Sequence, residues 1–349
     1  MLKSKTYIAI PPGATIKEQL EDRGISQKEF AARMELSEKH VSKLINGEVA
    51  LTYDVANRLE FVLGLPARFW NNLEADYREK IIKVNEENSM DLDKKLAIKF
   101  PCHEMIKNGW IPENKDKTSL VISLRKYFEV SSLESLGNPL ITRIACRRVG
   151  VTEKADYALL AWAQQAKLIA RNMDTDFINI KKLKSSIPII RSMTNMNPEV
   201  FVPRLIDLLS KCGIALVLLP HIGGSFLHGA TFLDGKKIVI GLTIRGKDAD
   251  RFWFSLFHEI GHIIYGHINQ QNGTSEEDES RADLFARDSL VNPTAFKNFV
   301  DKKDFQKNSI IDFSKEIGIA CGIIVGRLQK EGYIKYSWLN DLKVKYEMS

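Results

Sequence analysis

Two histidines and a glutamate in the C-terminal third of the chain have the spacing of a hydrolytic metal site. His258, Glu259 and His262 form the pattern HExxH, and residues four apart in a helix lie on the same face. Two imidazoles in this arrangement can bind one Zn²⁺ ion, which catalytic sites hold with three protein ligands and one open position. Glu259 lies beside the pair, so we expect it to take a proton from water and pass it to the leaving amine.

The third metal ligand is expected on a second helix further along the chain. The stretch from Ser275 to Asp278 fits a capping box, which predicts that a helix begins there. Glu279 and Asp283 share one face of this helix because they are four residues apart. We expect Glu279 to bind the metal and Asp283 to accept a hydrogen bond from the outer nitrogen of a ligating histidine.

Two further histidines could take part. A site of the HExxHxxGxxH class needs its third histidine six residues after the second. His267 lies only five residues after His262, so we expect His267 at the surface. His228 lies in a predicted hairpin and is a candidate for stabilising the transition state by polarising a substrate carbonyl.

The segment that carries these residues mixes strands with helices. A helix over 202–212 and a strand over 215–220 are followed by two β-rich runs, which an Asp-Gly pair separates; this pattern predicts a hairpin. Apolar residues then recur at three- and four-residue spacing from Phe252 to Ile264, which is typical of a buried helix. Residues 201–349 are therefore predicted to form an α+β domain with a small antiparallel sheet and C-terminal helices.

The N-terminal residues have the pattern of a helix-turn-helix domain. Ser26 and Ser37 are placed to cap two short helices, and Glu35-Leu36 between these helices has the length of a helix-turn-helix turn. Apolar residues of the second helix face the first helix. The side chains that could meet base edges or phosphates in a major groove are Lys39, His40, Ser42, Lys43 and Asn46.

The whole chain has 349 residues and a net charge of +6, and its length predicts two or three domains. We expect an all-α helix-turn-helix domain over 1–80, a helical middle region over 81–200, and the α+β domain over 201–349, so the fold is α+β and mostly helical. Residues 1–80 contain 12 basic and 12 acidic side chains. This balance predicts weak nonspecific DNA binding, so operator binding would need a homodimer or help from residues 81–220, which contain 21 basic and 15 acidic side chains.

Membrane and secreted classes do not fit the composition. No apolar run approaches the roughly 18 residues of a membrane helix, and the N-terminus has no signal-peptide core. The four cysteines are far apart and include no CxxC pair, which argues against a disulfide framework. A cytoplasmic protein without a membrane partner is expected.

Three segments of the C-terminal domain resemble the ImmA/IrrE family of metallopeptidases. They are Phe254–His262, Glu279–Ala286 and Leu290–Pro293, and the resemblance is strong over about 200–330. It implies a zincin-like domain that holds one Zn²⁺ per chain and cleaves a regulatory protein, often a repressor. Asp283 stands where family members usually have Asn, and either side chain can accept a hydrogen bond.

The N-terminal module resembles the Xre-type helix-turn-helix, most closely that of HigA-family antitoxins, in Ser26–Ala31, Val41–Gly47 and Phe69–Leu73. The resemblance implies binding to operator DNA and an antitoxin-like role. In such domains the turn usually carries a glycine at the position of Glu35. We therefore expect Glu35 to adopt a positive φ, which is uncommon for a residue with a side chain.

Together these patterns predict a transcriptional regulator with a zinc endopeptidase domain that hydrolyses a regulatory or toxin protein. The substrate is expected to lie as an added strand along residues 224–232. One alternative is a DNA-binding antitoxin or repressor whose peptidase fold only binds a partner. Another is a peptidase whose helix-turn-helix recognises a protein rather than DNA.

Overall fold

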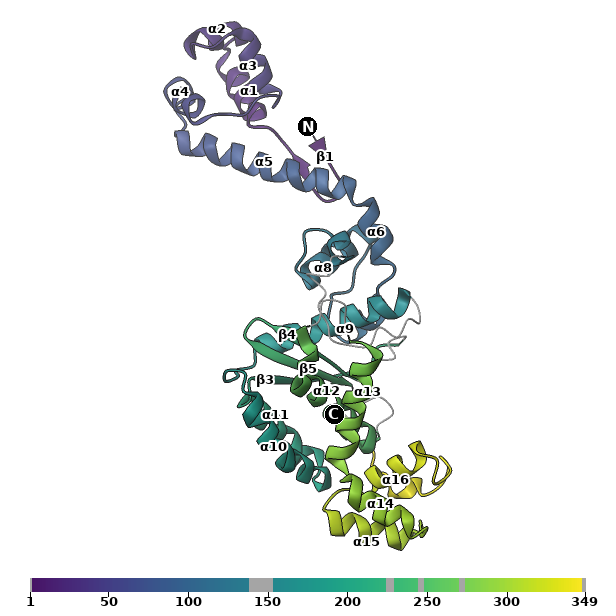
Figure 1. The fold of residues 1–349 in the computed structure, drawn as a ribbon. Coiled ribbons are helices and arrows are strands. Elements are labelled where there is room, and N and C mark those ends of the chain that lie inside the picture. Colours follow the sequence, from purple (N-terminus) through teal and green to yellow (C-terminus); the bar gives the residue numbers. More distant parts are fainter. Residues whose placement is uncertain (1, 138–152, 224–228, 244–247, 270–273, 347–349) are drawn as a thin grey trace. The chain divides into compact units, whose positions relative to one another are not determined.

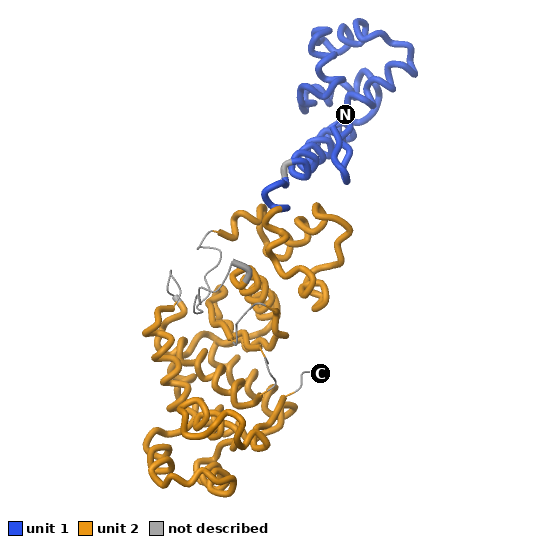
Figure 2. Tube along the Cα trace, turned by 90° about the vertical axis from the view of Figure 1, so that its right-hand side faces the viewer, with its two compact units in different colours: residues 1–94 blue, residues 95–349 orange. Residues whose placement is uncertain are grey.

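The computed structural model describes residues 2–137, 153–223, 229–243, 248–269 and 274–346. The chain forms two compact units, Met1–Lys94 (unit 1) and Lys95–Ser349 (unit 2), which Figure 2 distinguishes by colour. The division differs from the expected one. The expected boundary at residue 80 falls inside a helix that continues to Ser89, and residues 95–200 belong to the same unit as the C-terminal residues.

Unit 1 is a helical domain preceded by a two-stranded ribbon (Figure 1). Its elements are β1 (Leu2–Lys3), β2 (Ile8–Ala9), α1 (Pro12–Arg23), α2 (Gln27–Arg33), α3 (Glu38–Ile45), α4 (Tyr53–Leu63) and α5 (Ala67–Ser89). The first four helices and the start of α5 surround one apolar core, which includes Phe30, Val41, Leu59 and Trp70. The predicted helical helix-turn-helix region is therefore present, but the prediction that residues 1–80 are all-α is wrong, because β1 and β2 pair before α1.

Local signals determine where the helices of unit 1 begin. The Ser26 hydroxyl accepts a hydrogen bond from the Glu29 amide at 3.2 Å, and the Ser37 hydroxyl accepts one from the His40 amide at 3.2 Å. Each bond satisfies an amide that the first helical turn leaves unpaired. Between the two helices Glu35 has a φ of 53°, as the sequence predicted.

Unit 2 consists of helices around a three-stranded sheet. Its helices are α6 (Asp91–Ala97, which begins in unit 1), α7 (Cys102–Lys107), α8 (Lys117–Phe128), α9 (Glu153–Arg171), α10 (Ile180–Ser192), α11 (Pro198–Ser210), α12 (Ala249–Tyr265), α13 (Glu276–Leu290), α14 (Pro293–Asp301), α15 (Lys307–Ile317) and α16 (Cys321–Lys330). The strands are β3 (Ile214–Leu219), β4 (Gly229–Asp234) and β5 (Lys237–Thr243). Short 3₁₀ turns are η1 (Leu133–Gly137), η2 (Met193–Asn195), η3 (His267–Asn269) and η4 (Asn340–Leu342).

The sheet has the strand order β3-β5-β4 and is mixed. The predicted β4–β5 hairpin is confirmed: Asp234 pairs with Lys237, and Gly235 has a φ of 61° in the turn between them. The prediction of a wholly antiparallel sheet is wrong, because β5 lies between β4 and β3 and runs parallel to β3. The Asp-Gly pattern predicts that β4 pairs with β5, but it does not predict which of these two strands pairs with β3. That choice depends on packing.

Helices cover both faces of this sheet (Figure 1). Alternate residues of β3 contribute to two different apolar clusters, one with α11 and α12 and one with α9. Strands buried on both faces read as continuous apolar runs, as Ile214–Leu219 does. On the α9 side the Trp162 ring lies so close to Gly241 that a Cβ there would be 2.6 Å from it. Helix α9, expected in a separate middle region, is therefore part of the sheet domain.

None of the described helices combines the length and the apolar character needed to cross a membrane.

Candidate metal centre and helix-turn-helix surface

Helix α12 carries the HExxH residues, and its apolar face packs into the core of unit 2. Trp253, Leu256, Phe257 and Ile260 are fully buried on it. Helix α13 packs along α12, and Gly261 lies at the contact: a Cβ at Gly261 would be 3.2 Å from the Cα of Ala282. The small residue inside the HExxH pattern therefore allows the second helix to approach the first closely.

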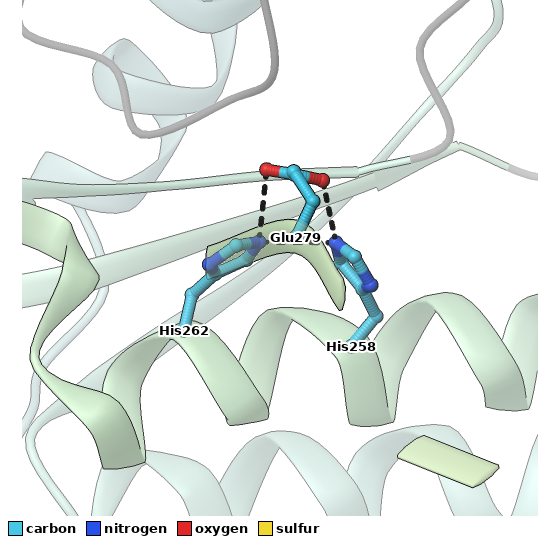
Figure 3. Close-up of side chains that lie close together, drawn as sticks. All are labelled: His258, His262 and Glu279. Carbon is cyan, nitrogen blue, oxygen red and sulfur yellow. Dashed lines mark hydrogen bonds and ion pairs between the residues drawn. The ribbon is translucent and has the colours of Figure 1, made fainter. Parts of the chain in front are cut away.

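A capping box places the third candidate ligand. The Ser275 hydroxyl accepts a bond from the Asp278 amide, and the Asp278 carboxylate accepts one from the Ser275 amide at 2.9 Å, as predicted. Glu279 then lies in the first turn of α13, and its carboxylate bridges the two histidines (Figure 3). Its Oε2 is 3.3 Å from His258 Nε2, and its Oε1 is 3.4 Å from His262 Nε2.

The three side chains are close enough together to share one metal ion. Donors about 2.0–2.1 Å from one ion, at tetrahedral angles, are about 3.3 Å apart, and the two Nε2 atoms of His258 and His262 are 3.0 Å apart. The Glu279 carboxylate faces both nitrogens, each through a different oxygen, and one ligand atom from each residue lies within 4.8 Å of the other two. Among the described residues, this is the group of histidine, cysteine and acidic side chains gathered closely enough to hold a metal ion.

Asp283 lies where the sequence predicted a supporting carboxylate. Its Oδ1 accepts a hydrogen bond from His258 Nδ1 at 2.8 Å, so the Nε2 atom of that ring points toward Glu279. Burial disfavours protonation of His258, but hydrogen bonds to Asp283 and Glu279 outweigh it and raise its pKa to about 10. For His262 burial prevails, and together with the neighbouring His258 charge it lowers the pKa.

Glu259 is the most deeply buried carboxylate at this site, with 5% of its surface exposed. Burial raises its pKa to about 7, although the His258 charge and a hydrogen bond from Thr231 act in the opposite direction. The Thr231 hydroxyl on β4 donates this bond to Glu259 Oε2 at 2.5 Å. Gly229, also on β4, leaves room for the same carboxylate, since a Cβ there would be 2.7 Å from Oε1.

The sequence missed both β4 contacts to Glu259. Thr231 and Gly229 occupy alternate positions of the strand, and alternate residues share a face of a sheet. No motif marks them, because their role depends on which strand packs against α12. His228, the predicted transition-state stabiliser, lies outside the described residues.

The expectation that His267 is at the surface is wrong: only 4% of it is exposed. Its Nδ1 is 3.0 Å from Nδ1 of His262, and its Nε2 is 3.2 Å from Oδ1 of Asp278. A five-residue step from His262 keeps His267 away from the centre only if the helix continues past Tyr265. Gly266 has a φ of 77° and ends α12, so the chain turns back and brings His267 against the helix that it has just left.

A groove of about 1020 Å³ lies along the N-terminal half of α12, beside α13, α16 and the C-terminal segment. The basic side chains that line it are Arg251, Arg287, Arg327, Lys330, Lys343 and Lys345. The three candidate ligands do not line the groove, but Asp283 does. Asp283 Oδ2 is 3.7 Å from the Lys330 ammonium, so this carboxylate contacts both the groove and His258.

In unit 1, helix α3 presents the predicted DNA-reading face. Its opposite face, Val41, Leu44 and Ile45, is buried in the core. A Cβ at Gly13 of α1 would be 2.1 Å from the Ile45 carbonyl oxygen, so α1 and α3 pack with their backbones almost in contact. Of the predicted DNA-contacting residues, His40 is half-buried and the others are exposed, namely Lys39, Ser42, Lys43 and Asn46.

Comparisons with known proteins concern this helix-turn-helix region. A family model described as helix-turn-helix matches residues 16–70. An uncharacterised helix-turn-helix transcriptional regulator of Escherichia coli K12, YddM, is 38% identical over 63 residues, which are 18% of this chain and 67% of that protein. The chain belongs to the helix-turn-helix transcriptional regulators. Its membership rests on the N-terminal domain, which is a DNA-binding domain.

Two solved structures are also similar. One is described as an antidote protein of a plasmid maintenance system from Nostoc punctiforme, with 29% identity, a TM-score of 0.23, and coverage of 24% of this chain and 91% of that one. The other is an addiction module antidote protein of the HigA family from Coxiella burnetii, with 26% identity, a TM-score of 0.22 and the same coverage. The residues matched as helix-turn-helix lie in unit 1, whereas the candidate metal centre lies in unit 2.

Proposed function

We propose that this regulator is also a zinc-dependent endopeptidase, which binds operator DNA through α3 and hydrolyses a peptide bond in a regulatory or toxin protein. The observation that carries the proposal is that His258, His262 and Glu279 converge, with the two Nε2 atoms 3.0 Å apart and the Glu279 carboxylate within 3.4 Å of both. The buried Glu259 carboxylate beside them supports hydrolysis, because a site that only held a structural metal would have no use for a buried base.

Each residue of the site has its own role in the proposed hydrolysis. His258, His262 and Glu279 would hold the ion, and Asp283 would keep the His258 ring in place. Zinc bound there supplies Lewis-acid activation of water and of the scissile carbonyl. Glu259, with its pKa raised to about 7, is suited to accept a proton from water and deliver it to the leaving amine near neutral pH. Thr231 holds Oε2 of this carboxylate by a hydrogen bond, and Gly229 leaves room for Oε1.

The edge of the sheet offers a place for an extended substrate. Strand β4 is an edge strand of the three-stranded sheet, and its residue Thr231 contacts Glu259. An extended polypeptide can add to such an edge through backbone hydrogen bonds. We therefore propose that the substrate lies along β4, which begins at Gly229; the remainder of the expected segment, residues 224–228, lies outside the described residues.

The test compares the wild-type chain with Glu259→Gln. Glutamine keeps the shape and can still accept the Thr231 bond, but it cannot take up a proton, so this variant should bind zinc as the wild type does and cleave nothing. Each protein, loaded with zinc, is incubated with an extract of cells that express it, and new protein N-termini are mapped by mass spectrometry. New N-termini present only with the wild type are expected.

New N-termini in equal number with both proteins would contradict the role of Glu259. Zinc binding without any wild-type cleavage would favour a repressor or antitoxin whose second unit only binds a partner. Gel shifts with the promoter of the chain's own gene test the DNA-binding function separately, because the substitutions that affect them lie in unit 1.

A further inference from the structure

The buried His267 and the partly exposed Asp278 form a pair beside one candidate metal ligand, His262. The His267 Nδ1 atom is 3.0 Å from Nδ1 of His262, and its Nε2 atom is 3.2 Å from Oδ1 of Asp278. Tyr265 stacks on the His267 ring with centroids 5.7 Å apart. Hydrogen-bonding distances therefore connect His262 to His267, and His267 to the Asp278 carboxylate.

The chemistry of imidazole determines which atom donates and which accepts in each of these hydrogen bonds. A neutral imidazole carries one hydrogen, so one ring nitrogen donates and the other accepts. His262 Nε2 faces His258 and Glu279 and must keep its lone pair to bind a metal. The hydrogen of His262 is then on Nδ1 and is donated to Nδ1 of His267. His267 in turn carries its hydrogen on Nε2, which faces the Asp278 carboxylate.

The opposite direction is incompatible with metal binding. If His267 Nδ1 donated, His262 would carry its hydrogen on Nε2, at the position that the metal needs. Asp278 favours the arrangement that allows metal binding. An ionised carboxylate only accepts hydrogen bonds, so the hydrogen of His267 belongs on Nε2, which faces Asp278. Its other oxygen, Oδ2, accepts from the Ser275 amide at 2.9 Å and from the Ser275 hydroxyl at 2.7 Å. Asp278 is therefore held by the capping box, immediately before Glu279 in the chain.

We propose that His267, backed by Asp278, is a positioning residue that fixes the tautomer and ring orientation of His262 for metal binding. The inference rests on the proposed zinc site. His267 would do for His262 what Asp283 does for His258, so each histidine of the HExxH pattern has its own hydrogen-bond acceptor. The acceptor for His262 is the His267 imidazole, and the Asp278 carboxylate in turn accepts from His267.

The test measures zinc affinity in variants of His267, by competition with a chromophoric chelator. In His267→Asn the side-chain oxygen occupies the place of Nδ1 and can accept from His262. In His267→Gln the amide lies one methylene further out, near the place of Nε2, and His267→Leu has no acceptor. Loss of such a partner typically weakens metal binding by about 10–100-fold. We expect that loss for Leu and Gln, and binding within a few-fold of the wild type for Asn.

Several outcomes would overturn the inference. Equal zinc affinity in all three variants and the wild type would show that His267 has no part in positioning His262. An equal loss in Asn and Gln, at equal thermal stability of the metal-free proteins, would reduce His267 to a packing role. If the wild type binds no zinc, the proposed function fails first and this inference with it, which the wild-type titration shows directly.

Discussion

Zinc should stabilise unit 2 selectively, because the candidate ligands are all in unit 2. His258 and His262 come from α12 and Glu279 from α13, so an ion held by all three ties the two helices together in the folded state only. A ligand that binds only the folded state raises the free energy of unfolding by about 4.1 kcal/mol when its free concentration is a thousand times its Kd.

The rise in Tm that this free energy produces depends on the size of unit 2. For domains of 150–250 residues, each kcal/mol shifts Tm by about 2–4 °C, with the smaller shift for the larger domains, and Lys95–Ser349 is slightly longer than this range. A thousand-fold excess of free zinc over Kd should therefore raise the Tm of unit 2 by about 8 °C. Unit 1, Met1–Lys94, should show no shift and serves as an internal reference.

The assay is differential scanning calorimetry of the full chain with zinc or with a chelator. His262→Ala combined with Glu279→Ala should abolish the shift, because a single imidazole remains. His103→Ala is the matched control, since His103 is an exposed histidine of unit 2 outside the candidate metal centre. A shift that persists in the double variant, or one that disappears equally in His103→Ala, would refute the assignment of the ligands.

Three further predictions concern DNA binding and packing. Lys39→Ala with Lys43→Ala should weaken binding of operator DNA and reduce the slope of log K against log salt by about 2, measured by fluorescence anisotropy. Gly13→Ala should destabilise unit 1 by about 1–3 kcal/mol, because its Cβ meets the backbone of α3 at 2.1 Å. Gly241→Ala should destabilise unit 2 similarly, since its Cβ lies 2.6 Å from the Trp162 ring; unchanged melting in either variant would contradict the packing described.

Short-range patterns predicted the parts of the candidate site that lie on single helices. HExxH on a helix places His258 and His262 one above the other, and the Ser275–Asp278 capping box defines where α13 begins. The spacing of Glu279 and Asp283 on α13 then places both on the side facing α12. These predictions depend on helix geometry and caps, which involve residues a few positions apart.

The contacts that sequence reasoning missed join segments far apart in the chain. Thr231 reaches Glu259 across 28 positions, and Trp162 meets Gly241 through the packing of α9 on the sheet. His267 is near in sequence, but its burial depends on the turn at Gly266 and on the position of Asp278 on another helix. None of these contacts has a local spacing rule that could reveal it.

Patterns over a few residues were enough to predict helix caps, the hairpin turn and the side chains of the candidate metal centre and the DNA-reading helix, because each depends on local backbone conformation. Sequence patterns did not show that β5 lies between β4 and β3, that α9 covers the sheet, or that Glu259 and His267 are buried with hydrogen-bond partners. These features depend on how apolar faces pack, and one apolar face can pack against several different partners.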